Sequence, residues 1–237
     1  MKQVTLFVLI AIFISSCHTA KQASYSSSDG YASEDTLITQ SLFNDKAATI
    51  SEENIQRVLD GSYKLPQQLR VAIVKLESSS QRRSYWYSWN DEQYLKTQQS
   101  YLDLFTDKFK QSSRVMKIFS VPDVLISRSP SFTNIREAAV RMQADIVVVY
   151  SIASDLYSKY KAFSKPDIKA YATTQLIIMD VRTGLIPFST ISTKDALSQK
   201  KKEELENAEA ASRVQNEAVL ATITDIGQKI TDFLNTQ

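Results

Sequence analysis

The sequence predicts an α/β domain with α+β character, built on a single mixed β-sheet flanked by helices and closed by a long C-terminal helix. Three observations indicate this class. Apolar runs rich in β-branched residues, at 69–76 (LRVAIVKL) and 145–152 (DIVVVYSI), are typical of strands buried on both faces. Segments of helical periodicity separate these runs, which favours parallel strands joined by crossovers. A tight turn at residues 182–184 adds an antiparallel hairpin.

The first elements of the domain follow from local signals. A short helix is expected over 51–59, with Ser51 as its N-cap and Gly61 just past its C-terminus. The strand over 69–76 comes next. Residues 91–111 form an amphipathic helix, because apolar and aromatic side chains recur there at helical spacing. This stripe consists of Tyr94, Leu95, Gln98, Tyr101, Leu102, Phe105 and Phe109.

The middle of the domain supplies the next strands of the sheet. A strand is expected over 115–121, followed by a helix over 134–142 that is capped from Ser131 or Thr133. The most apolar strand, 145–152, is expected at the centre of the sheet. The crossover helices predict that these first three strands are parallel.

The last third contains a hairpin and a helix. An extended strand over 168–181 runs into the turn, where Gly184 is expected to adopt a positive φ, and a return strand covers 185–192. The final helix spans about 200–235. Its narrow apolar stripe could pack on its own sheet or form an oligomer seam; the stripe consists of Val219, Ile223, Ile226, Ile230 and Phe233.

The N-terminal seventeen residues have the pattern of an export signal. Lys2 precedes an apolar run over 4–14, which at about 11 residues is shorter than the roughly 20 that a membrane span requires. Ile14-Ser15-Ser16-Cys17 resembles the bacterial lipobox, with Ile14 in place of the usual leucine. The resemblance implies a signal peptide over 1–16 and a diacylglycerol-type lipid with an N-acyl chain on Cys17, which would hold the chain on a bilayer.

The residues after Cys17 predict the cellular location of the protein and its domain boundaries. His18 stands where inner-membrane retention in enteric bacteria uses aspartate, so we expect an outer-membrane anchor facing the periplasm. The segment 17–36 is rich in Ser, Ala and Thr and is expected to act as a disordered tether. The remaining residues, 37–237, fit one globular domain.

Composition excludes several chemistries. The net charge of +2 gives no reason to expect nucleic-acid binding. The only histidine, His18, and the only cysteine, Cys17, lie outside the domain, so histidine-dependent catalysis, histidine zinc sites and thiol chemistry are not expected. The four glycines are isolated and cannot form a phosphate-binding loop. No metal, no cofactor beyond the covalent lipid and no catalytic residue are predicted.

Two catalytic alternatives stay open. Carboxylates alone could catalyse the hydrolysis of envelope glycan or peptide without a cofactor. Hydrogen bonding in turns and at helix caps is the simpler role for such side chains. Those near predicted strand ends are Glu77, Asp91, Asp145, Asp155, Asp167 and Asp180. Serine-lysine pairs also occur in this Ser- and Lys-rich chain, at 158–159, 164–165 and 198–201. The favoured interpretation is that the protein is not an enzyme.

Two aromatic and basic stretches follow predicted parallel strands, and we expect them at the carboxyl edge of the sheet, where α/β proteins tend to bind. Aromatic and arginine side chains dominate the energetics of protein interfaces. The first stretch contributes Arg82, Arg83, Tyr85, Trp86, Tyr87 and Trp89. The second contributes Tyr157, Tyr160, Lys161 and Phe163. The expected partner is an envelope protein, a peptidoglycan strand or a second copy of the chain. Core packing of Trp86 and Trp89 is the competing interpretation.

The order of these segments resembles a known group of proteins. The early strand LRVAIVKL, the unit ADIVVVYS and the long strand LIIMDVRTG entering a hairpin are similar to the periplasmic lipoproteins of curli secretion and penicillin-binding-protein activation. The aromatic and Lys-rich stretch at 157–163 makes the chain closer to the rhombotail lipoproteins. The match covers roughly residues 66–195, with Asp145 and 180–184 at the matching positions. It implies an envelope lipoprotein that binds other proteins.

Overall fold

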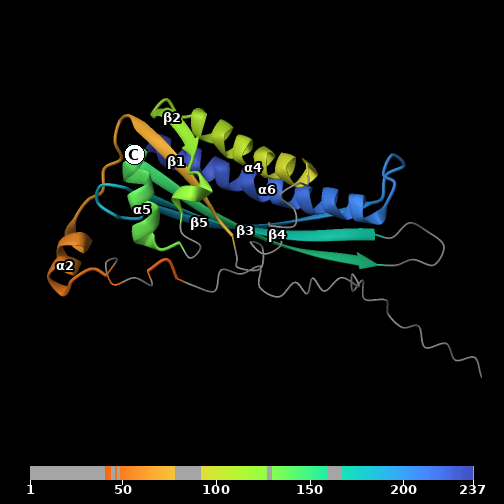
Figure 1. The fold of residues 1–237 in the computed structure, drawn as a ribbon, viewed down its shortest axis with the longest axis horizontal. Helices are drawn as coiled ribbons and strands as arrows, with labels where there is room; N and C mark the ends of the chain where they lie inside the picture. The colour runs from red at the N-terminus through yellow and green to blue at the C-terminus, as the bar shows by residue number, and fades with distance from the viewer. Residues whose placement is uncertain are drawn as a thin grey trace, which may run out of the picture. The chain divides into compact units, whose positions relative to one another are not determined.

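The computed structural model describes residues 41–43, 46, 49–77, 92–126, 130–159 and 167–236 (Figure 1). These ranges belong to the second of two compact units, Asp35–Gln237. The predicted signal peptide, Cys17 and the whole predicted tether lie outside the described residues. No helix within those ranges has both the length and the apolar character that crossing a bilayer requires.

Within the described ranges, five strands form one mixed sheet in the order β2-β1-β3-β4-β5. They are β1 (Leu69–Leu76), β2 (Val115–Ser120), β3 (Ile146–Lys159), β4 (Asp167–Asp180) and β5 (Phe188–Gln199). β1 pairs in parallel with both β2 and β3, whereas β3 with β4 and β4 with β5 are antiparallel. The predicted mixed sheet is confirmed, and the apolar run at 145–152 begins its central strand.

Helices lie on both faces of this sheet. α4 (Glu92–Lys110) and α6 (Asn207–Thr236) run side by side over one face (Figure 1), and α5 (Phe132–Arg141) packs on the opposite face. α2 (Glu52–Asp60) precedes the sheet and buries none of its side chains. A short 3-10 helix, η2 (Asp123–Leu125), follows β2.

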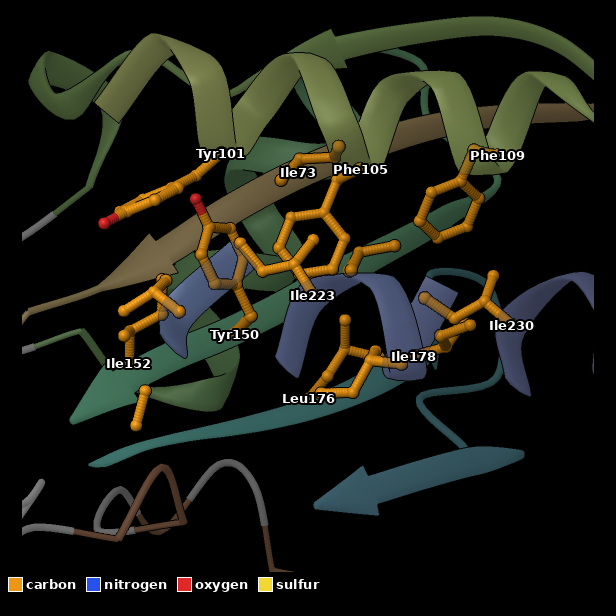
Figure 2. Packing of buried hydrophobic residues seen from close by; sticks show 14 of the residues in the cluster. Ile73, Tyr101, Phe105, Phe109, Tyr150, Ile152, Leu176, Ile178, Ile223 and Ile230 are labelled. Carbon is orange, nitrogen blue, oxygen red and sulfur yellow. The ribbon is translucent and has the colours of Figure 1, made fainter. Parts of the chain in front are cut away.

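The larger core fills the space between the sheet and the pair α4–α6. Figure 2 shows Phe105 and Phe109 of α4 reaching toward Ile223 and Ile230 of α6, above the strands. The ring of Phe105 lies 4.7 Å from that of Tyr150 on β3. The apolar stripe of α6 is almost completely buried against its own sheet and α4, so it is not available as an oligomer seam.

A smaller core lies under α5. Phe132 and Ile135 pack with Val74 of β1, Val147 of β3 and their neighbours. α5 is only 10 residues long, about 15 Å, and the buried positions under it end at about Val149 of β3. Within the described ranges, the remaining length of β3 and its partners β4 and β5 therefore has helices on one face only.

Three helix caps were predicted, and for α5 the structure decides between Ser131 and Thr133. The N-cap of α5 is Ser131, whose hydroxyl accepts a hydrogen bond from the Asn134 backbone N–H. At α2, Ser51 and Gly61 occupy the N-cap and C-cap positions as predicted; Ser51 makes no side-chain cap hydrogen bond, and Gly61 is extended, with a φ of −73°. The chain leaves α2 directly toward β1, so no left-handed residue is needed there.

Three boundaries differ from the predictions. β3 continues from the expected end at residue 152 to Lys159, because each added residue pairs with β4. β5 begins only at Phe188, after Pro187, and runs to Gln199; proline cannot donate to a strand ladder. The final helix starts at Asn207 and not near 200, since the connecting residues fold around the buried Glu204.

The hairpin turn after β4 is confirmed. Gly184 has a φ of +77°, and the Asp180 carboxylate accepts hydrogen bonds of 2.7 Å from both the backbone N–H and the hydroxyl of Thr183. The Arg136 guanidinium of α5 donates to the Val181 and Arg182 carbonyls. α5 and the turn are thereby fixed to each other.

Candidate interaction surface

The uncovered part of the sheet presents one set of alternating side chains outward. In β3, β4 and β5 the odd-numbered residues point away from α6, and the strand register aligns them in rows. We call this surface the open face. Its members are Ser151, Ala153, Asp155, Tyr157, Lys169, Tyr171, Thr173, Gln175, Ile191, Thr193, Asp195 and Leu197.

Large side chains on the open face are exposed. Tyr157 is 56% exposed and Tyr171 39%, whereas Ile191 and Leu197 on β5 reach 62% and 67%. Scattered apolar residues are normal on a protein surface. Here the strand backbone holds all four on one sheet surface, with Leu197 in the same row as Tyr157 and Lys169.

Contacts between these side chains order the middle of the open face. The rings of Tyr157 and Tyr171 meet edge to face at 5.7 Å between centroids. The Lys169 ammonium lies 4.6 Å from the centroid of the Tyr171 ring and 3.2 Å from the Asp195 carboxylate. Hydrogen bonding to Tyr171, and next to Asp195, raises the pKa of the Lys169 ammonium above its ordinary value. Lysine therefore stays charged on this face at physiological pH.

Such a surface is suited to recognition. Each tyrosine ring offers a binding partner an apolar surface and a hydroxyl group for hydrogen bonding. Because the tyrosines lie on strands, binding removes little further conformational entropy. Thr173 and Thr193 share a hydrogen bond of 2.9 Å and keep further capacity for a polar partner. Among the residues that the structure describes, no group of three His, Cys, Asp or Glu side chains could hold a metal ion.

Two of the predicted carboxylates, Asp145 and Asp180, have structural roles. Asp145, at the start of β3, accepts two hydrogen bonds of 2.9 Å from the Arg70 side chain and one from its backbone N–H, and Arg182 adds an ion pair at 3.1 Å. The hydrogen bonds from Arg70 are the main cause that lowers the pKa of Asp145 to about 2. Asp180 serves the hairpin turn and accepts from the Tyr63 hydroxyl.

The other predicted carboxylates that the structure describes lie at strand ends or on the open face. Glu77 forms an ion pair with Lys75 at 3.0 Å, and Asp167 accepts from the Gln199 amide. Asp155 is exposed on the open face. Asp91 lies outside the described residues. The serine-lysine candidates are described only in part; Ser198 there accepts from Arg213.

The structure relocates one predicted contact residue and does not describe the rest. Tyr157 belongs to a strand, not to a loop, and points outward from the open face. Arg82, Arg83, Tyr85, Trp86, Tyr87 and Trp89 of the first stretch and Tyr160, Lys161 and Phe163 of the second lie outside the described ranges.

The strand register shows how far apart β1 and β3 end along the sheet. β1 and β3 are parallel as predicted, but β1 ends opposite Ser151 and β3 runs eight residues further. At about 3.3 Å per residue this offset is roughly 26 Å. The carboxyl ends of β1 and β3 therefore lie at different levels along the sheet.

The sequence reasoning missed Tyr171, Ile191 and Leu197. The first lies inside a run that was correctly predicted as a strand, and the other two lie in β5, which was predicted too short. For Tyr171 the available signal was alternation, because apolar side chains recur at the even positions of 168–178, the positions that β4 buries. β5 carries no such signal, because its apolar Ile191 and Leu197 lie on the exposed side.

No known protein-family model and no curated protein sequence matches this chain. Solved structures give a distant similarity of fold to bacterial lipoproteins. A candidate lipoprotein from Caulobacter crescentus is 8% identical, with 70% of this chain and 90% of that one covered and a TM-score of 0.40. A minor lipoprotein from Acinetobacter baumannii is 11% identical over 73% and 94%, with a TM-score of 0.32. PelC from Paraburkholderia phytofirmans, a dodecamer, is 11% identical over 69% and 93%, with a TM-score of 0.27. The likeness extends to the arrangement of secondary structure alone.

Proposed function

We propose that this chain is a lipid-anchored protein of the bacterial envelope whose α/β domain binds another envelope protein through the open face. The observation that carries the binding part is the set Tyr157, Tyr171, Ile191 and Leu197, exposed together on a surface that α5 leaves uncovered. Interfaces gain most of their energy from such aromatic and aliphatic anchors. The proposal includes no catalytic step.

The anchoring part rests on the N-terminal sequence. A basic residue, a short apolar run and a small residue before Cys17 are the features that acylation and cleavage require. Two or more long chains on that cysteine would keep the protein on a membrane, where a single chain binds reversibly. The outer membrane, facing the periplasm, is the location we propose.

Anchoring is tested separately from binding. The intact mass of the mature protein should show acyl chains on Cys17, and a Cys17→Ser chain should leave the membrane fraction. An unmodified sulfur, or unchanged fractionation of Cys17→Ser, would refute the anchor. Neither result bears on the open face.

Binding is tested by photo-crosslinking in intact cells. A photoreactive amino acid at Tyr157, Ile191 or Leu197 should capture the same partner protein, identified by mass spectrometry. Lys96, on the exposed side of α4 and 75% exposed, is the matched control. Leu197→Asp should reduce capture from Tyr157 by tenfold or more, because a buried unpaired carboxylate is costly. Equal capture from Lys96 and from the open face would refute the proposal.

Glycan binding is a second candidate that the tyrosine pair favours. The edge-to-face rings of Tyr157 and Tyr171, next to threonine hydroxyls and a carboxylate, offer both a stacking surface and hydrogen bonds to a sugar. Calorimetric titration with muropeptides should then show heat that Tyr171→Ala abolishes. A flat titration would remove this candidate.

A further inference from the structure

β5 is an edge strand of unusual length. Its register with β4 runs without interruption from Phe188 to Gln199, and in the part of the chain that the structure describes no strand lies along its other side. Its twelve residues include neither proline nor glycine. An edge of this length presents a row of unpaired backbone donors and acceptors, which is a template for another strand.

The usual protections of an edge are weak here. The one acidic residue of the strand, Asp195, is paired with Lys169 of β4, and the one basic residue, Lys194, points to the helix face, where its ammonium lies 3.1 Å from Asp225 of α6. Besides Asp195, the outward side chains around the middle of the strand are Ile191, Thr193 and Leu197, of which two are apolar and more than half exposed.

We propose that β5 pairs antiparallel with β5 of a second copy of this chain, with Lys194 at the two-fold axis. The second copy is the occupant that the sequence of the strand fits. In an antiparallel pair that continues the same faces, opposing residues must both be odd or both be even. A centre at Lys194 places Ile191 opposite Leu197 of the second copy and Thr193 opposite its Asp195.

The neighbouring registers of the proposed β5–β5 pair bring less favourable side chains opposite each other. A centre at Thr193 would place Ile191 opposite Asp195, and a centre at Asp195 would place two carboxylates opposite each other. Like charges in direct opposition destabilise a strand pair, whereas aliphatic pairs stabilise it. A centre at Lys194 also opposes two like charges, on the helix face, where each ammonium keeps its Asp225 carboxylate beside it, as each Asp195 keeps Lys169. The two Ile191–Leu197 pairs, which no neighbouring register forms, are therefore what favour this register.

The helices allow this pairing. α6 lies beneath β4 and β5, as its contacts between Phe233 and Phe188 and between Asp225 and Lys194 show. Strands in the joined sheet would be about 4.8 Å apart, which places the two copies of α6 about 10 Å from each other. Packed helices are separated by about 8 to 10 Å. The second copy therefore fits without displacing α6, and the open face continues across both copies.

The register predicts which residues can be linked between two copies. The parent is the full chain carrying Cys17→Ser, purified in detergent, which removes its only thiol. Chains with Ile191→Cys and with Leu197→Cys are mixed and treated with a mild oxidant or a short thiol crosslinker. We expect a covalent dimer in the mixture and none from either variant alone, because in each homodimer the two introduced thiols lie about 20 Å apart.

A matched wrong-register mixture serves as the control. Ile191→Cys mixed with Thr193→Cys should give at least tenfold less product than the mixture with Leu197→Cys. Sedimentation equilibrium should show dimers of the parent, and Ile191→Asp should weaken the dimer at least tenfold while circular dichroism stays unchanged. Equal products from both mixtures, or a parent that stays monomeric at 100 µM protein, would overturn the proposal. An edge that accepts only an extended peptide of another protein would give this monomeric result.

Discussion

Replacing Asp145 by asparagine tests how the start of β3 is held. The carboxylate is buried and bonded to Arg70 and Arg182, and its pKa falls from 3.8 to about 2. Because the folded pKa lies below the unfolded one, the stabilisation is complete above about pH 4 and is lost as the pH falls toward 2. At 1.36 kcal/mol per unit the shift corresponds to about 2.5 kcal/mol.

That value is reduced by solvent around the cations. The Arg70 and Arg182 side chains are 38% and 69% exposed, and screening lowers what such pairs contribute, so we expect about 1 to 2 kcal/mol. Asparagine resembles the protonated carboxyl. The variant at pH 7 should therefore have lost about the amount that the parent loses between pH 5 and pH 2 at this position.

Urea unfolding of the chain from residue 35 onward, at several pH values, measures this directly. The free energies of unfolding of the parent and of Asp145→Asn should differ at pH 7 and converge near pH 2. Asp195→Asn, which removes a surface pair with Lys169, is the control and should cost less than about 0.5 kcal/mol. Two parallel curves down to pH 2 would refute the assigned cause of the pKa shift.

Three further changes test the packing. The Thr222 hydroxyl donates to the Val219 carbonyl and so accepts from the Thr174 hydroxyl at 2.6 Å. Thr222→Val should lower the free energy of unfolding in urea by about 1 to 3 kcal/mol. The loss should be smaller in a Thr174→Val background, because no buried hydroxyl is then left unpaired. Additive losses would contradict this hydrogen-bond direction. Gly184→Ala, at a φ of +77°, should destabilise the hairpin turn by about 1 kcal/mol and lower the Tm; an unchanged Tm would show that the turn relaxes. Phe105→Ala, fully buried between α4 and the sheet, should cost about 3 to 5 kcal/mol, and a loss below about 1 kcal/mol would mean that the core collapses into the space.

The sequence predicted those elements whose signal is local. β1 matches its predicted bounds, because the apolar residues of LRVAIVKL are buried in the two cores on opposite faces of the sheet. The turn at Gly184 and the cap at Ser131 also followed from single residues with a strong conformational preference. The second half of β3 could not be found in this way. Its apolar run stops at residue 152, and its remaining residues are strand only because β4 pairs with them.

The candidate surface could not be predicted from any one segment of the sequence, because three strands contribute to it. Tyr157 was selected for its aromatic character, but its neighbours Lys169, Tyr171 and Leu197 come from two other strands. Bringing them together requires the register, which is set by pairing across the sheet and by which face a helix covers. The connection before α6 failed for a related reason. The final helix was expected to begin near residue 200, whereas Glu204 is held by Arg213 and fixes an irregular path up to Asn207.

The uneven helix cover has a consequence for how the sheet opens. Near Val147 the central strand is enclosed from above and below, whereas near Asp155 one side meets solvent directly. Backbone amides at the enclosed end should exchange with deuterium only when the whole domain unfolds, and those at the solvent end through smaller, more frequent openings. A ligand seated at the solvent end would slow that exchange locally and leave the enclosed end as it was.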